Sequence, residues 1–318
     1  MGLPVTDYRY TDPGAPQLVN GTPSEWIAIL KACLMNGYGT KAPLGWTLEF
    51  EDAGSQKVAF RNSLANGGSG GYFQFWSSTG ANAANTTCLI QCAKDMSALD
   101  TFIKPVNYRG LYQNSTYRGW EIIGTSRGFY LILHRTNNML MSDGTNTSSY
   151  QYFQVYFIGD IESFYANDQS MFTLVSGTTG GNTANSLGVS HNAKYAYFYD
   201  TDAGSGTVRE YSTIDPFTGN NNSTIYTDNA ELSGIQHILS PFLLTITYST
   251  TDRDGVVSAS SLISPMVRGK IPGMYSSQFM GYRNDSWPID VSMNGVMHTL
   301  LRSNYAPHIW INMEQWYD

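Results

Sequence analysis

Charged residues are scarce in this 318-residue chain. They make up 14% of the sequence, whereas an ordinary soluble domain carries roughly 25%. The net charge of −7 also has the wrong sign for a sequence-independent grip on nucleic-acid phosphates. We therefore expect no nucleic-acid partner, and a neutral surface of the kind that suits a protein covered by its neighbours.

Long hydrophobic runs are also missing. A membrane-spanning helix needs roughly 20 apolar residues in succession, and the apolar segments around Phe129 and Phe242 are much shorter. Residues 1–7 lack the basic start and the apolar stretch of a secretory signal. We expect no membrane span, and synthesis and retention in a cytosol.

Cysteine is rare, with three in the chain. Cys88 and Cys92 lie four residues apart, which in a strand puts both on one face about 13 Å apart and prevents a bond between them. Cys33 belongs to the apolar stripe of a predicted helix, and no histidine stands near a cysteine at a spacing typical of zinc ligands. The sequence therefore predicts three small buried hydrophobes, no metal site and no cofactor.

Signatures of catalysis are absent as well. The glycine-rich residues 66–71 are followed by an aromatic strand, without a helix or a Lys-Ser pair, so they predict a hairpin loop and not a phosphate loop. No Gly-x-Ser-x-Gly segment lies at a predicted strand-to-helix junction, which is where such a segment carries a nucleophile. We expect that the protein is not an enzyme and has no catalytic residues.

Three pairs of acidic residues are spaced two apart: Asp160 with Glu162, Asp200 with Asp202, and Asp252 with Asp254. On a strand, both carboxylates of such a pair would lie on one face about 7 Å apart. Glycosidase carboxylates span that range, but they normally come from different strands across a cleft. We therefore interpret the last two pairs as turn caps and keep a cell-wall hydrolase as a minor alternative.

One helix is clearly predicted, beginning at residue 22. Thr22, Pro23 and Glu25 combine an N-cap, a proline at the first helical position and the acidic residue of a capping box. Apolar side chains then recur at steps of three and four, so one stripe must pack on a sheet, and Gly37 ends the helix. The stripe consists of Trp26, Ile27, Leu30, Cys33 and Leu34.

Most of the remaining chain alternates apolar and polar residues, which is typical of strands. Residues 46–51 and 58–60 predict one hairpin, and residues 119–124 and 129–133 predict another, whose second strand is buried on both faces. The fold class is therefore mainly β, with antiparallel, sandwich-like sheets and one principal N-terminal α-helix packed on a sheet. Further strands are expected at residues 72–76, 87–93, 150–158, 170–175, 195–200, 206–212, 242–248, 256–263 and 296–302.

We divide the chain into three parts. Residues 1–20 contain three prolines and no periodicity, and predict an extended N-terminal arm. Residues 21–110 predict the helix with a small β unit, and residues 111–318 a larger antiparallel β region. The alternative is that the last two parts form one domain.

Several segments resemble a known family. They read TDPGAPQL at residues 11–18, LMNGYG at 34–39, GWT at 45–47, FIGDIES at 157–163 with Asp168, and VRGKIPGMY at 267–275. These segments are similar to landmarks of a family of tailed-bacteriophage virion proteins. The resemblance implies a structural part of a virus particle. Because the landmarks are turn glycines, prolines and aromatics, it transfers no functional residues.

The resemblance also implies partners and a location. The partners would be other phage virion proteins, and the protein would reside in the virion after synthesis in the bacterial host cytoplasm. Phage particles are built from closed rings, so a homo-oligomer in a symmetric ring is expected. Tail, baseplate, neck and head surface all stay open as positions.

We expect the contacts with neighbours to come from the two ends of the chain, where large apolar side chains would be exposed unless something covers them. Docking of both ends on their own domain is the alternative. The candidate assembly contacts are Tyr10, Pro13, Pro16, Trp310, Met313, Trp316 and Tyr317.

A receptor- or carbohydrate-binding β module of the phage particle is the second function class, with a host surface glycan as its partner. Exposed aromatic rings on a β scaffold would stack against sugar faces. The candidate stacking residues are Trp76, Trp120, Trp287, Trp310 and Trp316.

Overall fold

The computed structural model is that of a mainly β protein, as the sequence predicts. It describes residues 2–135, 153–177, 195–204, 206, 208–214, 216, 238–246, 265–277, 285–301 and 309–318. Of these residues, 54% are in strands and 8% are helical, with a single helix near the N-terminus. The sheets are antiparallel, so the predicted fold class is confirmed.

The helix α1 (Pro23–Lys31) begins where the sequence places it. The Thr22 side chain accepts a hydrogen bond from the Glu25 N–H, and the Glu25 carboxylate accepts one from the Thr22 N–H, which completes the capping box. The chain continues as one π-helical turn over Ala32–Asn36 and ends at Gly37, whose φ of 75° favours glycine. All five residues of the predicted apolar stripe are buried.

The chain after the helix forms a five-stranded sheet whose strands follow sequence order. The predicted hairpin of residues 46–60 is its first, and the glycine-rich residues 66–71 join its second and third strands, as expected. Alternate side chains, such as Phe60 and Phe73, face the stripe of α1. The strands are β3 (Thr47–Asp52), β4 (Lys57–Arg61), β5 (Tyr72–Ser77), β6 (Cys88–Ala98) and β7 (Thr101–Leu111).

A second five-stranded sheet is buried on both faces. Along its strand β9, Phe129 and Leu131 belong to the apolar cluster that contains α1, whereas Tyr130 and Ile132 belong to a different cluster. This double burial of β9 was predicted from its unbroken apolar run and is confirmed. In spatial order the strands are β12 (Phe172–Val175), β10 (Phe153–Asp160), β9 (Gly128–Arg135), β8 (Tyr117–Gly124) and β2 (Thr6–Arg9).

The third sheet comes from the second half of the chain. Its longest strand, β16, was not predicted as a strand, although it contains the landmark segment at residues 267–275. The expected strand at residues 256–263 lies outside the described residues. In spatial order the strands are β13 (Tyr195–Phe198), β14 (Arg209–Ile214), β15 (Leu239–Ile246), β16 (Val267–Ser277), β19 (Ile309–Asn312), β18 (Val296–Leu301) and β17 (Asp290–Met293), and β11 (Glu162–Ser163) also pairs with β16.

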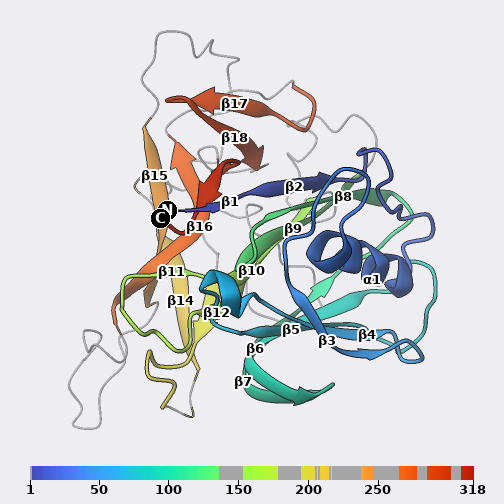
Figure 1. Ribbon diagram of the computed structural model, residues 1–318, viewed down its shortest axis with the longest axis horizontal. Coiled ribbons are helices and arrows are strands. Elements are labelled where there is room, and N and C mark those ends of the chain that lie inside the picture. The colour runs from blue at the N-terminus through green and yellow to red at the C-terminus, as the bar shows by residue number, and fades with distance from the viewer. Residues whose placement is uncertain are drawn as a thin grey trace.

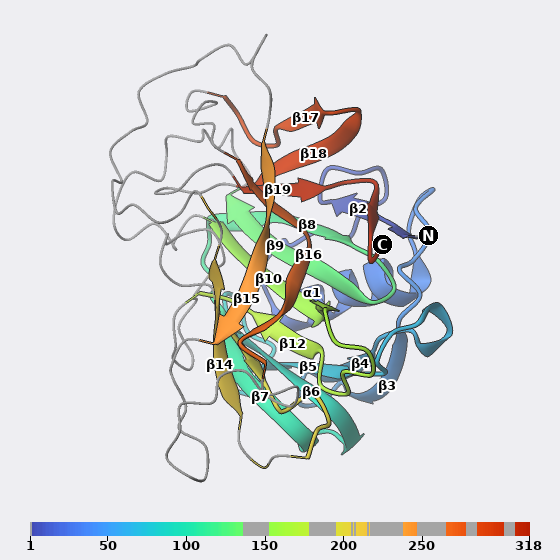
Figure 2. The ribbon, with the colours of Figure 1, turned by 90° about the vertical axis from the view of Figure 1, so that its left-hand side faces the viewer.

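The β8–β9–β10 sheet is therefore a middle layer between two cores (Figure 1). We call the first the helix-side core; it joins α1 and the β3–β7 sheet to one face of the middle sheet. The second, which we call the tail-side core, joins the other face to the third sheet and contains Trp310 and Trp316. Figures 1 and 2 show α1 and β15 on different sides of the middle sheet.

The two ends of the described chain meet. Strand β1 (Leu3–Pro4) pairs with β20 (Gln315–Trp316), and the Val5 N–H donates to the Glu314 carbonyl over 2.9 Å. The N and C labels accordingly lie side by side in both ribbon views (Figures 1 and 2). The N-terminal segment is extended, and it is held along the chain's own sheets.

The three cysteines are free and buried, as predicted. Burial raises the pKa of the Cys33, Cys88 and Cys92 thiols above the ordinary value. A thiol that stays protonated is a poor nucleophile and metal ligand, so these side chains act as packing groups.

Candidate functional site

The candidate contacts of the N-terminal arm rest on the chain's own surface. The Tyr10 N–H donates to the Trp120 carbonyl over 3.0 Å, and the Trp120 indole donates to the Pro16 carbonyl over 3.0 Å. Pro13 is exposed, and its carbonyl lies so close to Gly39 that a Cβ on this glycine would approach it to 2.6 Å. Tyr10 and Pro16 therefore position the arm, and Pro13 remains open to solvent.

The candidate contacts of the C-terminal tail also include residues that the chain itself buries and residues that are partly exposed. Trp310 and Trp316 have exposures of 0% and 1% and belong to the tail-side core. Their indoles donate to the Ser277 hydroxyl over 3.0 Å and to the Asn312 carbonyl over 2.8 Å. Met313 and Tyr317 are half-buried. The chain itself thus covers both tryptophans, which agrees with the alternative that the tail docks on its own domain. Contact of this tail with a neighbour stays a prediction.

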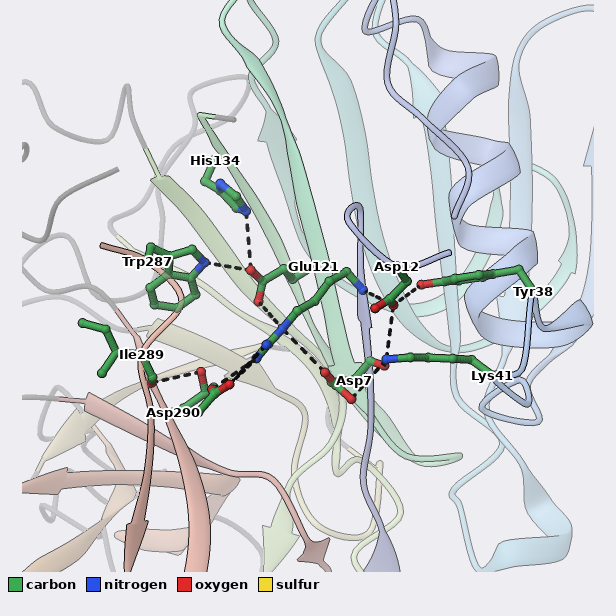
Figure 3. A network of polar contacts seen from close by, with 11 residues as sticks. Asp7, Asp12, Tyr38, Lys41, Glu121, His134, Trp287, Ile289 and Asp290 are labelled. Carbon is green, nitrogen blue, oxygen red and sulfur yellow. Dashed lines mark hydrogen bonds and ion pairs between the residues drawn. The ribbon is translucent and has the colours of Figure 1, made fainter. Parts of the chain in front are cut away.

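A network of charged side chains ties the arm to two of the sheets (Figure 3). The Arg9 guanidinium on β2 forms two-pronged contacts of 3.1 Å with Asp290 on β17. Its Nε lies 3.5 Å from Asp7 and 3.7 Å from the buried Glu121 on β8. Because Arg9 and Glu121 belong to the middle sheet and Asp290 to the third sheet, the network fixes how these two sheets meet.

The same network extends to the segment after the helix. Lys41 Nζ lies 3.3 Å from Asp7 Oδ1 and 3.2 Å from Asp12 Oδ2, and the Tyr38 hydroxyl donates to Asp12 over 2.8 Å. Burial alone would raise the pKa of the Asp12 carboxyl, but the hydrogen bonds from the Arg9 N–H, Tyr38 and Lys41 outweigh it and hold this pKa below its usual range. The landmark segments 11–18 and 34–39 therefore contact each other here.

A cleft of about 530 Å³ lies beside the C-terminal residues. It has the size of many ligand sites, and both charges and apolar groups line it. Strand β11, the turn before β9 and the C-terminal residues contribute its walls. The lining residues are Arg127, Ile161, Glu162, Ser163, Phe164, Tyr165, Asn167, Asp168, Met171, Lys270, Tyr317 and Asp318.

Arg127 lines the cleft, and its partner there is the fully buried Asp160. Arg127 Nε lies 3.4 Å from Asp160 Oδ2, and the guanidinium carbon stands 4.1 Å above the centre of the Tyr317 ring. Asp160 also accepts hydrogen bonds from Asn62 over 3.0 Å and from the Ser69 N–H over 2.9 Å. Burial raises the pKa of the Asp160 carboxyl despite these donors. Tyr317 completes the cluster by donating to the Asp160 backbone carbonyl over 2.7 Å.

Two further ion pairs hold the walls. Arg268 makes a two-pronged contact with Asp168, at 2.6 and 2.9 Å, and each side chain of this pair is 1% exposed. Lys270 pairs with Glu162 at 2.8 Å. Both pairs join the landmark segment 267–275 to the segment around Asp168, so these landmarks also meet in space.

The acidic pairs singled out in the sequence have partners within the chain. Asp160 and Glu162 pair with Arg127 and Lys270, and Asp200 lies 3.2 Å from Arg209. Asp202 accepts a hydrogen bond from the Gly204 N–H over 2.8 Å, which is the predicted turn cap. Asp252 and Asp254 lie outside the described residues.

The tryptophans proposed for sugar stacking are mostly inside the protein. Trp120, Trp287, Trp310 and Trp316 have exposures between 0% and 9%, so the prediction of exposed rings is wrong for these four. Each lies in an apolar cluster that its large ring helps to fill. Trp76, on β5, is half-buried and keeps part of its ring at the surface.

Sequence reasoning missed the cations of the cleft. Arg127 falls between the predicted strands at residues 119–124 and 129–133, and Lys270 and Arg268 fall within a landmark segment. Nothing in the local sequence shows that Arg268 meets Asp168, 100 residues away. Glu162, Asp168 and Tyr317, which the sequence analysis singles out for other reasons, also line the cleft.

No family model matches the chain, and no curated protein matches it significantly. The part of the chain that the structure describes contains no helix long and apolar enough to cross a membrane. Within the same residues, no cluster of three or more His, Cys, Asp or Glu side chains has an arrangement that could hold a metal ion.

Proposed function

We propose that this protein is a structural component of a tailed-bacteriophage virion that acts through contacts with other virion proteins and carries out no reaction. The observation that carries the proposal is the meeting of its landmark segments. Residues 11–18 contact 34–39 through Asp12 and Tyr38, and Asp168 contacts 267–275 through Arg268. The segments on which the resemblance rests therefore form two structural joints, as expected of one shared architecture.

The state of the charged groups supports the same proposal. The described members of the acidic pairs hold ion pairs or a turn, so none of them presents the free acid and base that glycoside hydrolysis requires. A surface with few charges and with scattered exposed apolar side chains suits protein contacts. Such side chains are Val19, Leu64, Ile103, Phe164, Ile214, Ile238 and Met266.

Carbohydrate binding is less well supported. Of the five tryptophans considered for it, Trp76 is the one that is not buried. We therefore place a host surface glycan second to protein partners.

The test is the composition of purified particles. We expect mass spectrometry to find the protein in density-purified virions at a constant ratio to a major structural protein, and immunogold labelling to place it at one site. A phage with a nonsense codon early in the gene should accumulate incomplete particles, which the wild-type gene supplied in trans should rescue. Absence from purified virions, or normal particles without the gene, would contradict the proposal.

The expected symmetric ring needs a separate test of the oligomeric state. Sedimentation or light scattering of the purified chain, alone and with a lysate-purified subassembly, should give a mass that is a small integer multiple of one chain. A protein that is monomeric in solution and occurs once per particle would remove the ring from the proposal.

A further inference from the structure

Arg127 is held in the cleft through one edge of its guanidinium, and its Nη1 makes no polar contact within the described residues. Nε of the guanidinium faces Asp160 at 3.4 Å, and the only other polar contact of this group within the described residues is from Nη2 to the Met171 sulfur, at 3.9 Å. The ring of Tyr317, at 4.1 Å, fixes the plane of the guanidinium. A planar guanidinium with free terminal N–H groups is the fork that binds a carboxylate through two parallel hydrogen bonds.

Asp318 is the exposed carboxylate of the cleft, and its charge acts on Lys270, whose pKa it helps to raise. The remaining charges of the lining are held in ion pairs. Lys270 and Glu162 are 2.8 Å apart, and Asp168 is bound by Arg268 at 2.6 Å. Both contacts are shorter than the one between Arg127 and Asp160. Arg127 is therefore the cation in this cleft that has capacity for an incoming anion.

The rim offers apolar surface next to that cation. Phe164 follows β11 and is 56% exposed, although its N–H is fixed to the Arg268 carbonyl over 2.9 Å. Ile161 and Met171 line the same cleft as Phe164 and Arg127. An exposed aromatic ring on rigid backbone, beside apolar walls and one available guanidinium, suits an extended peptide that carries an acidic side chain between apolar ones.

We propose that the cleft binds such a segment of a neighbouring protein, with Arg127 binding its Asp or Glu carboxylate and Phe164 packing against its apolar residues. The inference rests on the proposed function, because it names the chemistry of one partner contact. Tyr317 positions Arg127 by stacking and does not itself bind the carboxylate.

The experiment uses the full chain and two capped pentapeptides, one with glutamate and one with glutamine between two leucines. Binding is followed by NMR titration of the isotope-labelled protein. We expect the glutamate peptide to bind about tenfold more tightly, which corresponds to about 1.4 kcal/mol, and to shift the signals of Arg127 and Phe164. Raising the salt concentration should reduce this preference.

Three variants separate the contributions. Arg127→Lys keeps a charge beside Asp160 but loses the fork, so the preference for glutamate should fall to about twofold or less. Phe164→Ala removes an exposed ring and should weaken both peptides equally. Arg118→Lys, an arginine on β8 that does not line the cleft, is the matched control and should change neither affinity.

Equal affinities for the two peptides, no binding of either, or a preference that survives Arg127→Lys would overturn the inference. If Arg127→Lys fails to fold, the comparison of the two peptides on the wild-type protein still decides. Should the protein be present in virions while the glutamate preference is absent, the cleft assignment fails and the virion proposal stands. The converse result would reject the virion proposal alone.

Discussion

The two cores on either side of the middle sheet are built differently. In the helix-side core, aromatic rings pack directly: the Trp46 ring lies 5.2 Å from Phe129 and 5.7 Å from Phe73, centre to centre. In the tail-side core, the Arg268 guanidinium lies 4.7 Å above the Phe198 ring while it binds Asp168. The buried arginine beside the first core, Arg109, donates to the Ser176 hydroxyl, whereas the buried Arg268 of the second core pairs with a carboxylate 100 residues away.

The difference matters because the two kinds of core fail in different ways. Apolar contacts are lost in proportion to the area removed, and a substitution leaves a cavity or a misplaced polar group. A buried ion pair contributes little net stability, but removal of one partner leaves the other charge uncompensated. Substitutions in the two cores should therefore be distinguishable by their double mutants.

The largest effect is expected from deletion of residues 309–318. This change removes β19, β20 and two tryptophans of the tail-side core, so the chain should not reach its native fold. Near-ultraviolet circular dichroism would report the loss. An unchanged spectrum and unfolding midpoint would mean that the tail packs elsewhere.

The deletion changes folding and assembly together, so it cannot test the tail as an interface. Met313→Ser is the better test of that contact, because it alters a half-buried side chain.

Leu30→Asp tests the helix-side core. Leu30 is 0% exposed, so the new carboxylate would be buried without a partner and should lower the free energy of unfolding by more than about 4 kcal/mol. Ala28→Asp, on the exposed face of the same helix, is the control and should cost less than about 1 kcal/mol. Similar denaturant midpoints for the two variants would show that the stripe is not buried.

Arg268→Met tests the tail-side core. Loss of the guanidinium leaves Asp168 buried and unpaired, with an expected cost of about 3–5 kcal/mol. The double variant Arg268→Met/Asp168→Leu should regain most of that stability, because neither charge is then left alone. If the losses in unfolding free energy of the two single variants simply add in the double variant, the two residues are not coupled.

Thr22→Ala tests the start of α1. Loss of the hydroxyl that accepts from the Glu25 N–H should cost about 1 kcal/mol in chemical denaturation. Thr22→Ser keeps the acceptor and should stay close to the wild type. An equal loss in both variants would point to packing of the Thr22 methyl group in place of capping.

The smallest effect concerns pH. The pKa of Asp12 is lowered in the folded state, so its ionised form adds stability above the unfolded value of about 3.9, and this stability is lost as the pH falls through the folded pKa. Asp12→Asn should therefore be less stable than the wild type near neutral pH, by about 1 kcal/mol or less, and equally stable in acid. Unfolding midpoints measured across this range would check it, and a difference independent of pH would contradict it.

The sequence by itself determined the local elements. The capping box at Thr22, the apolar stripe of α1 and the double burial of β9 depend on residues within a few positions of each other, so their patterns could be identified without a structure. The general class, antiparallel β with one helix, follows from the same local periodicity.

The tertiary structure decided which elements meet, and with them the candidate site. The composition of the C-terminal tail predicts that its large apolar side chains are buried. Whether a neighbour or the chain itself buries Trp316 depends on the position of β1, which comes from the opposite end of the sequence. The cleft likewise needs the turn at Arg127, the segment at Glu162 and strand β16 to come together. Side-chain periodicity records which face of an element is buried and carries no information on its partner, because many apolar surfaces can satisfy one stripe.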